Sequence, residues 1–290
     1  MRGVRGVREV RGVPQCDRAA ALVGAIRLRR GCERARVHNR RMKARFHAPK
    51  AQAPGDVVSL PVDEAEHLTR VLRLKPGDVV RVFNGRGGEF DAIVEQAGKN
   101  GALVRVGTAQ RPAPEARVAI TLAQAALKGD KMDDVVRDTV MLGVARIQPI
   151  VTAHAEVTGA SLARSQRRDR WQRIAISAAK QCGRATVPQI LEPLDFGDLV
   201  EALANITLPR PALMLVEPGA GADATRLSEL DVSPQRAATV IIGPEGGWSG
   251  RELEQGASVG RLVTLGGRTL RADAMPIVAL AALFTIWGEF

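Results

Sequence analysis

The feature that most constrains the fold of this 290-residue chain is an alternation of strand and helix patterns that begins near residue 118. Apolar runs typical of strands occur at VAITLAQA, ARIQPIVT, ALMLVEP, TVIIGPE and LVTLGG, residues 118–125, 145–152, 212–218, 239–245 and 262–267. Helical patterns occur at 131–142, at 164–182 and from about 273 to the end. Such alternation is typical of a parallel sheet with helices on both faces. The sequence therefore predicts an α/β domain over residues 113–290.

The preceding part of the chain has the pattern of a smaller β structure. Three alternating runs, 78–85, 88–96 and 101–107, are separated by the glycine turns GRGG and GKNG, and a helical pattern precedes them at 63–73. We expect a small antiparallel barrel or sheet over residues 42–112. A stretch with two prolines, residues 108–117, is expected to act as a linker.

Most of the excess positive charge lies in the first 41 residues. Twelve of the 42 Lys and Arg residues fall there, but only three of the 31 Asp and Glu residues, which leaves 30 basic and 28 acidic residues elsewhere. The net charge of +11 is therefore no evidence that the folded body binds nucleic acid. We predict that residues 1–41 are a disordered extension, or translated sequence upstream of a natural start at Met42. An RNA-binding arm and a targeting peptide are the alternatives.

Several classes of protein are excluded by what the sequence lacks. No apolar run reaches the length of a membrane span. Cys16, Cys32 and Cys182 form no CxxC pair, and the four histidines are scattered. We therefore expect no membrane association, no disulfide framework and no metal, and a reducing compartment.

Three of the expected strands end in loops of unusual composition: LVEPG (215–219), IIGPEGG (241–247) and LGGRTLRAD (265–273). Ligands bind beyond the carboxyl ends of parallel strands, so we expect these loops to converge at one edge of the sheet. Their glycines allow a ligand to approach the backbone closely, or allow positive φ angles. Ser249 and Glu252 have the spacing of a capping box, which would fix the start of the next helix.

GPEGG is also compatible with an ordinary tight turn between a strand and a helix. That interpretation leaves unexplained the second glycine loop about 20 residues later and the isolated Glu245 among helix-breaking residues. The pattern therefore favours a ligand site.

Four motifs resemble, in their order, those of the RsmE family: GDKMD at 129–133, AAKQCGR at 178–184, IIGPEGGWS at 241–249 and LGGRTLRAD at 265–273. The similarity runs from about residue 42 to the C-terminus and includes EHLTRVLRLKPGD, which resembles the family's N-terminal, RNA-binding PUA-like barrel. Members of this family are SPOUT-type methyltransferases that modify N3 of one uridine in 16S ribosomal RNA. The resemblance implies a trefoil-knotted α/β domain, S-adenosylmethionine as cofactor, the small ribosomal subunit as partner and a cytoplasmic homodimer.

The resemblance also implies a cofactor pocket built from the three loops. The residues expected to form it are Leu215, Glu217, Gly219, Ile242, Gly243, Pro244, Gly246, Gly247, Leu265, Gly266, Arg268 and Leu270. Ile242, Leu265 and Leu270 would offer apolar surface to the adenine ring. Because S-adenosylmethionine has no phosphates, the pocket needs no phosphate-binding helix N-terminus.

The catalytic candidates also come from the matched motifs. Arg271 and Arg184 would hold the anionic base or its phosphate, and each has an alternative interpretation as a surface or dimer-contact arginine. Glu245 is a candidate base, or a hydrogen-bond acceptor that fixes neighbouring amides. Trp248 would either stack on a base or pack internally. The five arginines of RSQRRDRWQR (164–173) either line the RNA path or form a solvated helix face.

The chain departs from the family pattern at 138–141, 153–155 and 273–276. These departures concern the substrate more than the cofactor, since the glycine loops are intact. Two alternatives stay open: another SPOUT methyltransferase acting on tRNA or on a ribose 2′-hydroxyl, and a ribosome-assembly factor that kept the fold and lost catalysis. The N-terminal barrel and the KGDKMD motif favour uridine-N3 methylation.

Overall fold

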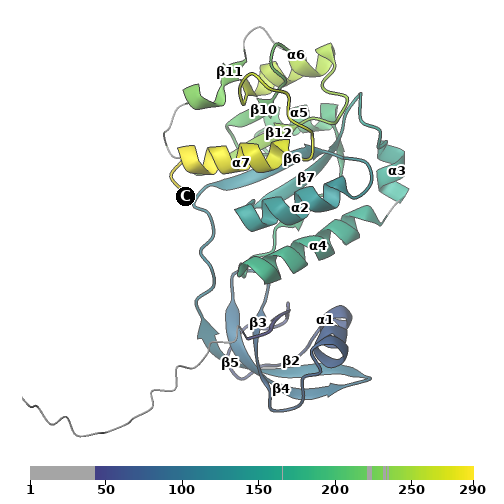
Figure 1. Cartoon of the computed structure of the whole chain (residues 1–290), viewed down its shortest axis with the longest axis vertical. Coiled ribbons are helices and arrows are strands. Elements are labelled where there is room, and N and C mark those ends of the chain that lie inside the picture. The colour runs from purple at the N-terminus through teal and green to yellow at the C-terminus, as the bar shows by residue number, and fades with distance from the viewer. Residues whose placement is uncertain (1–42, 165, 221–223, 231–232, 234) are drawn as a thin grey trace, which may run out of the picture. The chain divides into compact units, whose positions relative to one another are not determined.

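Two β-sheets organise the residues that the computed structural model describes, which are 43–290 apart from 165, 221–223, 231–232 and 234 (Figure 1). The prediction for residues 1–41 lies outside this range. No helix within it is long and apolar enough to span a bilayer. The smaller sheet comes first in the chain and the larger one follows.

The smaller sheet has five strands in the order β1-β3-β4-β5-β2. Their bounds are Arg45–His47 (β1), Val57–Ser59 (β2), Val79–Phe83 (β3), Glu89–Gly98 (β4) and Gly101–Gln110 (β5). The pairs are antiparallel except that of β1 with β3. Alternate residues along the strands are buried in one core. This core also contains Phe46 of β1 and Leu68 of the helical segment that follows β2.

Strands β3, β4 and β5 confirm the three predicted runs, but two details differ. The helix expected at 63–73 is α1 (Val62–Glu66) followed by a π-helical turn (His67–Val71). Strand β5 continues to Gln110 because β4 still offers it a partner there, with Gln110 opposite Glu89. The first residues of the expected linker are therefore strand.

The larger sheet is parallel and has the strand order β11-β13-β10-β12-β6-β7-β8, with β9 also paired to β7. The strand bounds are Ala119–Ala125 (β6), Arg146–Val151 (β7), Gln189–Ile190 (β8), Leu194–Asp195 (β9), Ala212–Leu215 (β10), Thr225–Arg226 (β11), Ala237–Ile242 (β12) and Arg261–Thr264 (β13). Strands β6, β7, β10, β12 and β13 confirm the predicted ones. Consecutive residues of β10 and β12 are buried, as expected for strands covered on both faces.

Helices cover both faces of this sheet and confirm the predicted architecture (Figure 1). Their bounds are Lys131–Leu142 (α2), Gly159–Arg164 (α3), Arg167–Cys182 (α4), Phe196–Ala204 (α5), Gly250–Val259 (α6) and Met275–Ile286 (α7). Helices α2, α4 and α7 bury Met132, Trp171 and Phe284 in one core. Helices α5 and α6 bury Leu199 and Val259 in the core on the opposite face.

The position of β13 gives the sheet a knotted topology. Strand β13 lies between β10 and β11, although the chain has already passed from β10 through β11 to β12 before it forms β13. It comes from α6 on one face of the sheet and continues to α7 on the other. The chain therefore passes through the loop closed by β10, β11 and β12, which is the trefoil-knotted arrangement that the family resemblance implies.

Candidate functional site

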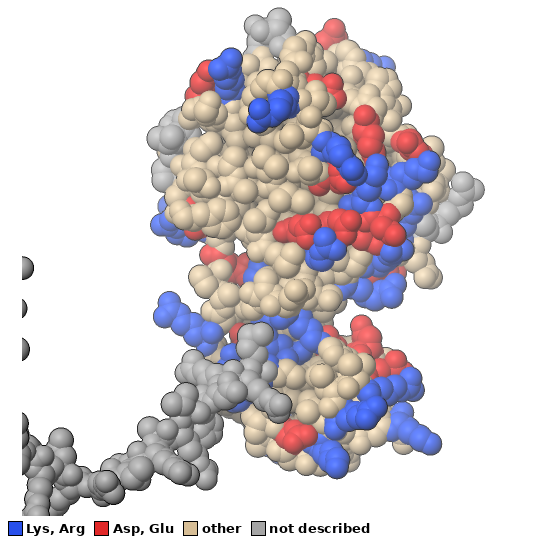
Figure 2. Space-filling view, viewed as in Figure 1, with Lys and Arg blue, Asp and Glu red and all other residues tan. Residues whose placement is uncertain are grey.

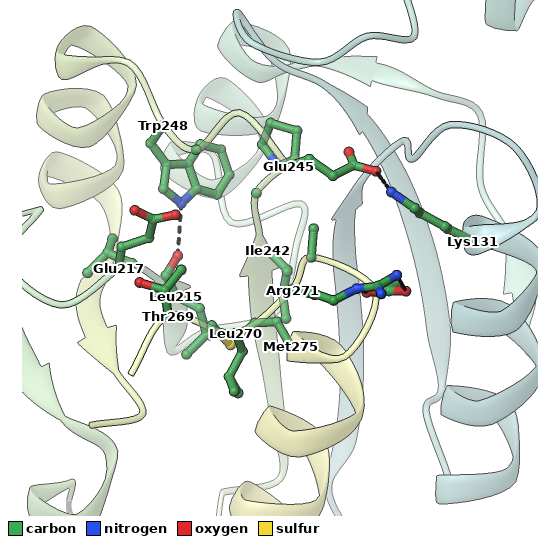
Figure 3. Close-up of a pocket in the computed structure, with 16 residues that line it drawn as sticks. Lys131, Leu215, Glu217, Ile242, Glu245, Trp248, Thr269, Leu270, Arg271 and Met275 are labelled. Carbon is green, nitrogen blue, oxygen red and sulfur yellow. Dashed lines mark hydrogen bonds and ion pairs between the residues drawn. The ribbon is translucent and has the colours of Figure 1, made fainter. Parts of the chain in front are cut away.

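A cavity of about 290 Å³ lies at the carboxyl ends of β10 and β12 (Figure 3). Its walls come from the exits of these two strands, from the segment between β13 and α7, and from the first residues of α2 and α7. They consist of Lys131, Leu215, Val216, Glu217, Ile242, Gly243, Pro244, Glu245, Gly247, Trp248, Thr269, Leu270, Arg271, Ala272, Asp273 and Met275. The volume lies near the lower end of the range for small-molecule sites, roughly 300–1,000 Å³.

The strand register explains why these segments meet. Strand β10 pairs with β12 on one side and with β13 on the other, with Met214 opposite both Ile241 and Leu262. All three strands run in the same direction, so their carboxyl ends are level and the loops that follow share one edge. This confirms the predicted convergence of the three loops.

Trp248 forms part of the cavity wall and is held by specific contacts. Its indole Nε1–H donates a hydrogen bond to the carbonyl oxygen of Leu215 at 2.8 Å. Its ring centroid lies 5.3 Å from that of Phe196, the first residue of α5, which is buried in the core. A Cβ at position 243 would lie 2.9 Å from the indole, so Gly243 leaves the space that the ring occupies. These contacts favour the packing interpretation of Trp248.

The GPEGG loop is a tight turn as well as a cavity wall. The Gly247 N–H donates to the carbonyl of Pro244 at 3.2 Å, and Gly247 has a positive φ of 71°. A Cβ at Gly246 would lie 2.9 Å from both the Cβ and the carbonyl oxygen of His154. Gly246 is therefore required by the loop that follows β7, and it does not line the cavity. The expectation that a ligand approaches its backbone is not supported.

The predicted capping box is confirmed at the start of α6. Ser249 Oγ accepts a hydrogen bond from the Glu252 N–H, and the Glu252 carboxylate accepts one from the Ser249 N–H. The other oxygen of Glu252 accepts a hydrogen bond from the Ala153 N–H at 2.8 Å. The buried Glu252 thus ties the loop after β7 to the start of α6.

Lys131, Glu245 and Arg271 gather on one side of the cavity, opposite Trp248 and Glu217 (Figure 3). Lys131 Nζ lies 2.8 Å from Glu245 Oε1. The Arg271 guanidinium forms two hydrogen bonds with the carboxylate of Asp273, at 3.0 and 2.7 Å. These hydrogen bonds lower the pKa of Asp273 below its ordinary value, and the nearby Lys131 charge adds a smaller effect.

The structure brings most of the predicted site residues together, but not all. Those that line the cavity are Leu215, Glu217, Ile242, Gly243, Pro244, Glu245, Gly247, Leu270 and Arg271. Leu265, Gly266 and Arg268 instead line a neighbouring cavity of about 890 Å³ beside α7, which Leu270 also reaches. Gly219 has a positive φ of 84° but lines neither cavity.

Arg184 does not join the site, and its predicted role needs correction. Its side chain is buried, and its guanidinium pairs with the carboxylate of Glu115. The same group donates to the carbonyls of Val140 and Val144, at the end of α2, at 2.7 and 3.0 Å. Arg184 therefore closes the end of a helix and fastens the segment that leads into β6. Among the described residues, Arg184 is not part of the wall of the cavity.

Lys131 and Met275 line the cavity from outside the three predicted loops, and the sequence analysis does not identify them; Val216, Thr269, Ala272 and Asp273 lie within those loops without having been predicted individually. Lys131 belongs to the motif GDKMD, which carried the family resemblance without any residue of it being given a role. It begins a helix of a βα unit, and that position was the available signal, since helices of such units begin at the carboxyl edge of the sheet.

Two of the four arginines of α4 are paired with acidic side chains. Arg170 contacts Asp130 and Asp133, and Arg168 contacts Glu192. Figure 2 shows basic and acidic side chains interspersed on one side of the molecule. Since these charges compensate each other locally, this surface supports the interpretation of α4 as a solvated helix face.

Two family models match the chain. One, described as an RNA methyltransferase domain, matches residues 114–284, and one described as an RNA methyltransferase PUA domain matches residues 60–107. The first covers the parallel sheet and the cavity, and the second covers most of the smaller sheet.

Individual relatives agree with these models. Ribosomal RNA small subunit methyltransferase E of a Synechocystis species is 34% identical over 236 residues, which are 78% of this chain and 72% of that protein. The protein of the same name from Rickettsia conorii is 31% identical over 240 residues, covering 82% and 93%.

Solved structures agree as well. Ribosomal RNA small subunit methyltransferase E of Neisseria gonorrhoeae, bound to S-adenosylmethionine, has a TM-score of 0.74 and 33% identity, covering 86% of this chain and 99% of that one. A methyltransferase of Legionella pneumophila, in complex with the same cofactor, has a TM-score of 0.75 and 30% identity, covering 84% and 97%. This chain therefore belongs to the RNA methyltransferase family, among the ribosomal RNA small subunit methyltransferases E.

Proposed function

We propose that the protein transfers a methyl group from S-adenosylmethionine to N3 of one uridine in the 16S ribosomal RNA of the small subunit. The observation that carries this proposal is the cavity at the ends of β10 and β12, which combines loop backbone, apolar side chains and charged groups. The family of the chain and the cofactor in the solved Neisseria relative support it.

The lining of the cavity suits S-adenosylmethionine. Ile242, Leu270 and Met275 provide apolar surface for the adenine ring, and the carboxylate of Glu217 provides a partner for the amino group of the cofactor. The start of α6 is closed by its own capping box, which agrees with a ligand that has no phosphate. When bound, the cofactor would supply an electrophilic methyl group on a positively charged sulfur.

The charged side of the cavity would receive the target nucleotide. The Arg271 side chain is largely exposed, and three of its five N–H groups make no hydrogen bond within the described residues, so it can hold a phosphate or a uracil oxygen. Holding both reactants in line can contribute up to roughly 7–11 kcal/mol to lowering the barrier. Uracil N3 carries a proton at neutral pH, so the site must also favour the deprotonated base.

The dimer is part of the same proposal. Helix α7 contains no charged residue, and its Val278 is 43% exposed. Val278 lines the cavity beside α7 together with the apolar Leu265 and Ile286. A second copy of the chain would cover this apolar side. Sedimentation of the wild-type protein and of Val278→Asp tests this: we expect a dimer for the first and a shift toward monomer for the second. A wild-type monomer at high concentration would contradict it.

The smaller sheet, matched by the PUA model, would contact the ribosomal RNA, and the protein would act in the cytoplasm, where its substrate is made.

Labelled S-adenosylmethionine offered with methyl-deficient small subunits, bare 16S RNA and tRNA tests the reaction. We expect label as 3-methyluridine in the small-subunit RNA. Label confined to tRNA or to ribose hydroxyls would contradict the proposal, and tight cofactor binding without transfer would favour an assembly factor.

A further inference from the structure

The ammonium group of Lys131 lies at the charged wall of the cavity, on the side opposite Trp248 and Glu217 (Figure 3). Lys131 is the first residue of α2, and its partner Glu245 follows β12, the strand next to β6 in the sheet. Because β6 leads into α2, the exits of two adjacent strands bring this pair together. The ion pair is thus a consequence of the sheet order.

The ion pair leaves donor capacity on the lysine. Within the described residues, one of the three N–H groups of Lys131 is used, in its 2.8 Å hydrogen bond to Glu245. The Lys131 side chain is 41% exposed, so the other two N–H groups can reach a ligand in the cavity. Arg271, the other cation at this wall, is already paired with Asp273 through two hydrogen bonds.

The charges around Lys131 are mostly carboxylates. Glu245 faces it from the loop after β12 and Asp273 from the segment before α7, while Arg271 adds a positive charge beside Asp273. Lys128 pairs with Glu156 at 2.8 Å, and the pKa of Glu156 is lowered mainly by Lys128 and slightly by Lys131. Carboxylates therefore face the Lys131 ammonium group from two segments of the cavity wall.

We propose that Lys131 is a catalytic residue that donates hydrogen bonds to a carbonyl oxygen of the target uracil and stabilises its N3 anion. The inference rests on the proposed function. Loss of the N3 proton to water leaves a negative charge that is shared between N3 and the two flanking carbonyl oxygens. The N3 electron pair then forms the new bond to the methyl carbon, and the electrons of the carbon–sulfur bond go to sulfur. A fixed ammonium group beside one oxygen stabilises that charge as it develops.

Glu245 has a positioning role in this scheme. Its carboxylate fixes the direction of the Lys131 side chain before the RNA binds, and it does not need to accept the N3 proton. This replaces the role of base that the sequence leaves open for Glu245. Glu245→Gln keeps the lysine charge and should therefore lower the rate less than Lys131→Met.

The test compares single-turnover rates at saturating RNA and cofactor for the wild type, Lys131→Met and Lys128→Met. Lys128 is the matched control: it loses the same charge from an ion pair of equal length, but it does not line the cavity. We expect Lys131→Met to lower the rate roughly 100-fold at neutral pH, with cofactor affinity by calorimetry unchanged. Lys128→Met should leave the saturated rate unchanged.

Two further measurements distinguish stabilisation of the uracil anion from a role of Lys131 that only maintains the shape of the site. The deficit of Lys131→Met should shrink as the pH rises toward the ionisation of uracil, and it should shrink with RNA that contains the more acidic 5-fluorouridine. A Lys131→Met rate within a few-fold of the wild type, or a deficit that is constant across pH and base, would overturn the inference alone. Absence of 3-methyluridine with the wild-type enzyme would overturn the proposed function and the inference with it.

Discussion

The indole N–H of Trp248 donates a hydrogen bond to the carbonyl oxygen of Leu215, 33 positions earlier in the chain and 2.8 Å away. This bond joins the loop after β12 to the last residue of β10. Two walls of the cavity are therefore held at a fixed separation by one side chain.

Replacing this donor should weaken the site. Trp248→Phe keeps an aromatic ring against Phe196 but leaves the Leu215 carbonyl without its partner, at a cost of about 1 kcal/mol. We expect weaker S-adenosylmethionine binding by calorimetry. Trp287→Phe is the matched control, because the buried Trp287 Nε1 has no hydrogen-bond partner among the residues that the structure describes and lies outside the cavity. Equal cofactor affinity in the wild type and Trp248→Phe would contradict the prediction.

Gly246→Ala should destabilise the fold. The new Cβ would lie 2.9 Å from the backbone of His154, and such overpacking costs roughly 1–3 kcal/mol. Gly267→Ala is the control, since a Cβ there meets nothing within 4 Å. Thermal unfolding should show a clear loss of Tm for the first variant and little change for the second. Similar Tm values for Gly246→Ala and Gly267→Ala would contradict the prediction, because they would show that the loop after β7 can move to accommodate the new Cβ.

Arg184→Met should also act on stability, with little effect on the cavity. It leaves the carbonyls of Val140 and Val144 without donors and Glu115 without its cation, at a cost of roughly 3 kcal/mol. Arg70→Met, at an exposed ion pair with Glu66, should cost less than about 1 kcal/mol. Chemical denaturation measures both. Normal stability of Arg184→Met together with lost methyl transfer would restore the catalytic role that the sequence suggested.

The Arg271–Asp273 pair predicts a pH dependence. Because the hydrogen bonds from Arg271 lower the pKa of Asp273 in the folded protein, the pair is intact at neutral pH. Its contribution to stability is lost only as the pH falls through that lowered pKa. In Arg271→Ala the titration midpoint of Asp273, followed by carbon NMR, should rise. The same variant should stay folded and transfer methyl groups slowly, and an unchanged midpoint would show that the hydrogen bonds do not persist in solution.

Local signals in the sequence predict much of the fold. The pattern at 131–142 coincides with α2, and the Ser249–Glu252 spacing forms the capping box it indicates, because both depend on residues within one or two turns. Strands β8, β9 and β11 have two residues each, and runs this short carry no detectable period.

The site was harder to predict where roles depend on which edge of the sheet a residue reaches. Arg184 follows the C-terminal end of α4, and helices in βα units run opposite to the strands, so it lies at the far edge from the cavity. Lys131, at the start of α2, lies at the near edge by the same rule. Similarly, the contact of Gly246 with His154 joins residues 92 positions apart, which no local pattern reveals.

The insertion of β13 between β10 and β11 has a consequence for biosynthesis. The third wall of the cavity, residues 269–275, belongs to the segment that is threaded through the earlier strands. A nascent chain that stops before this segment can complete neither the cavity nor the helix that follows it. The capacity to take up a methyl donor therefore arises only after synthesis has passed residue 275.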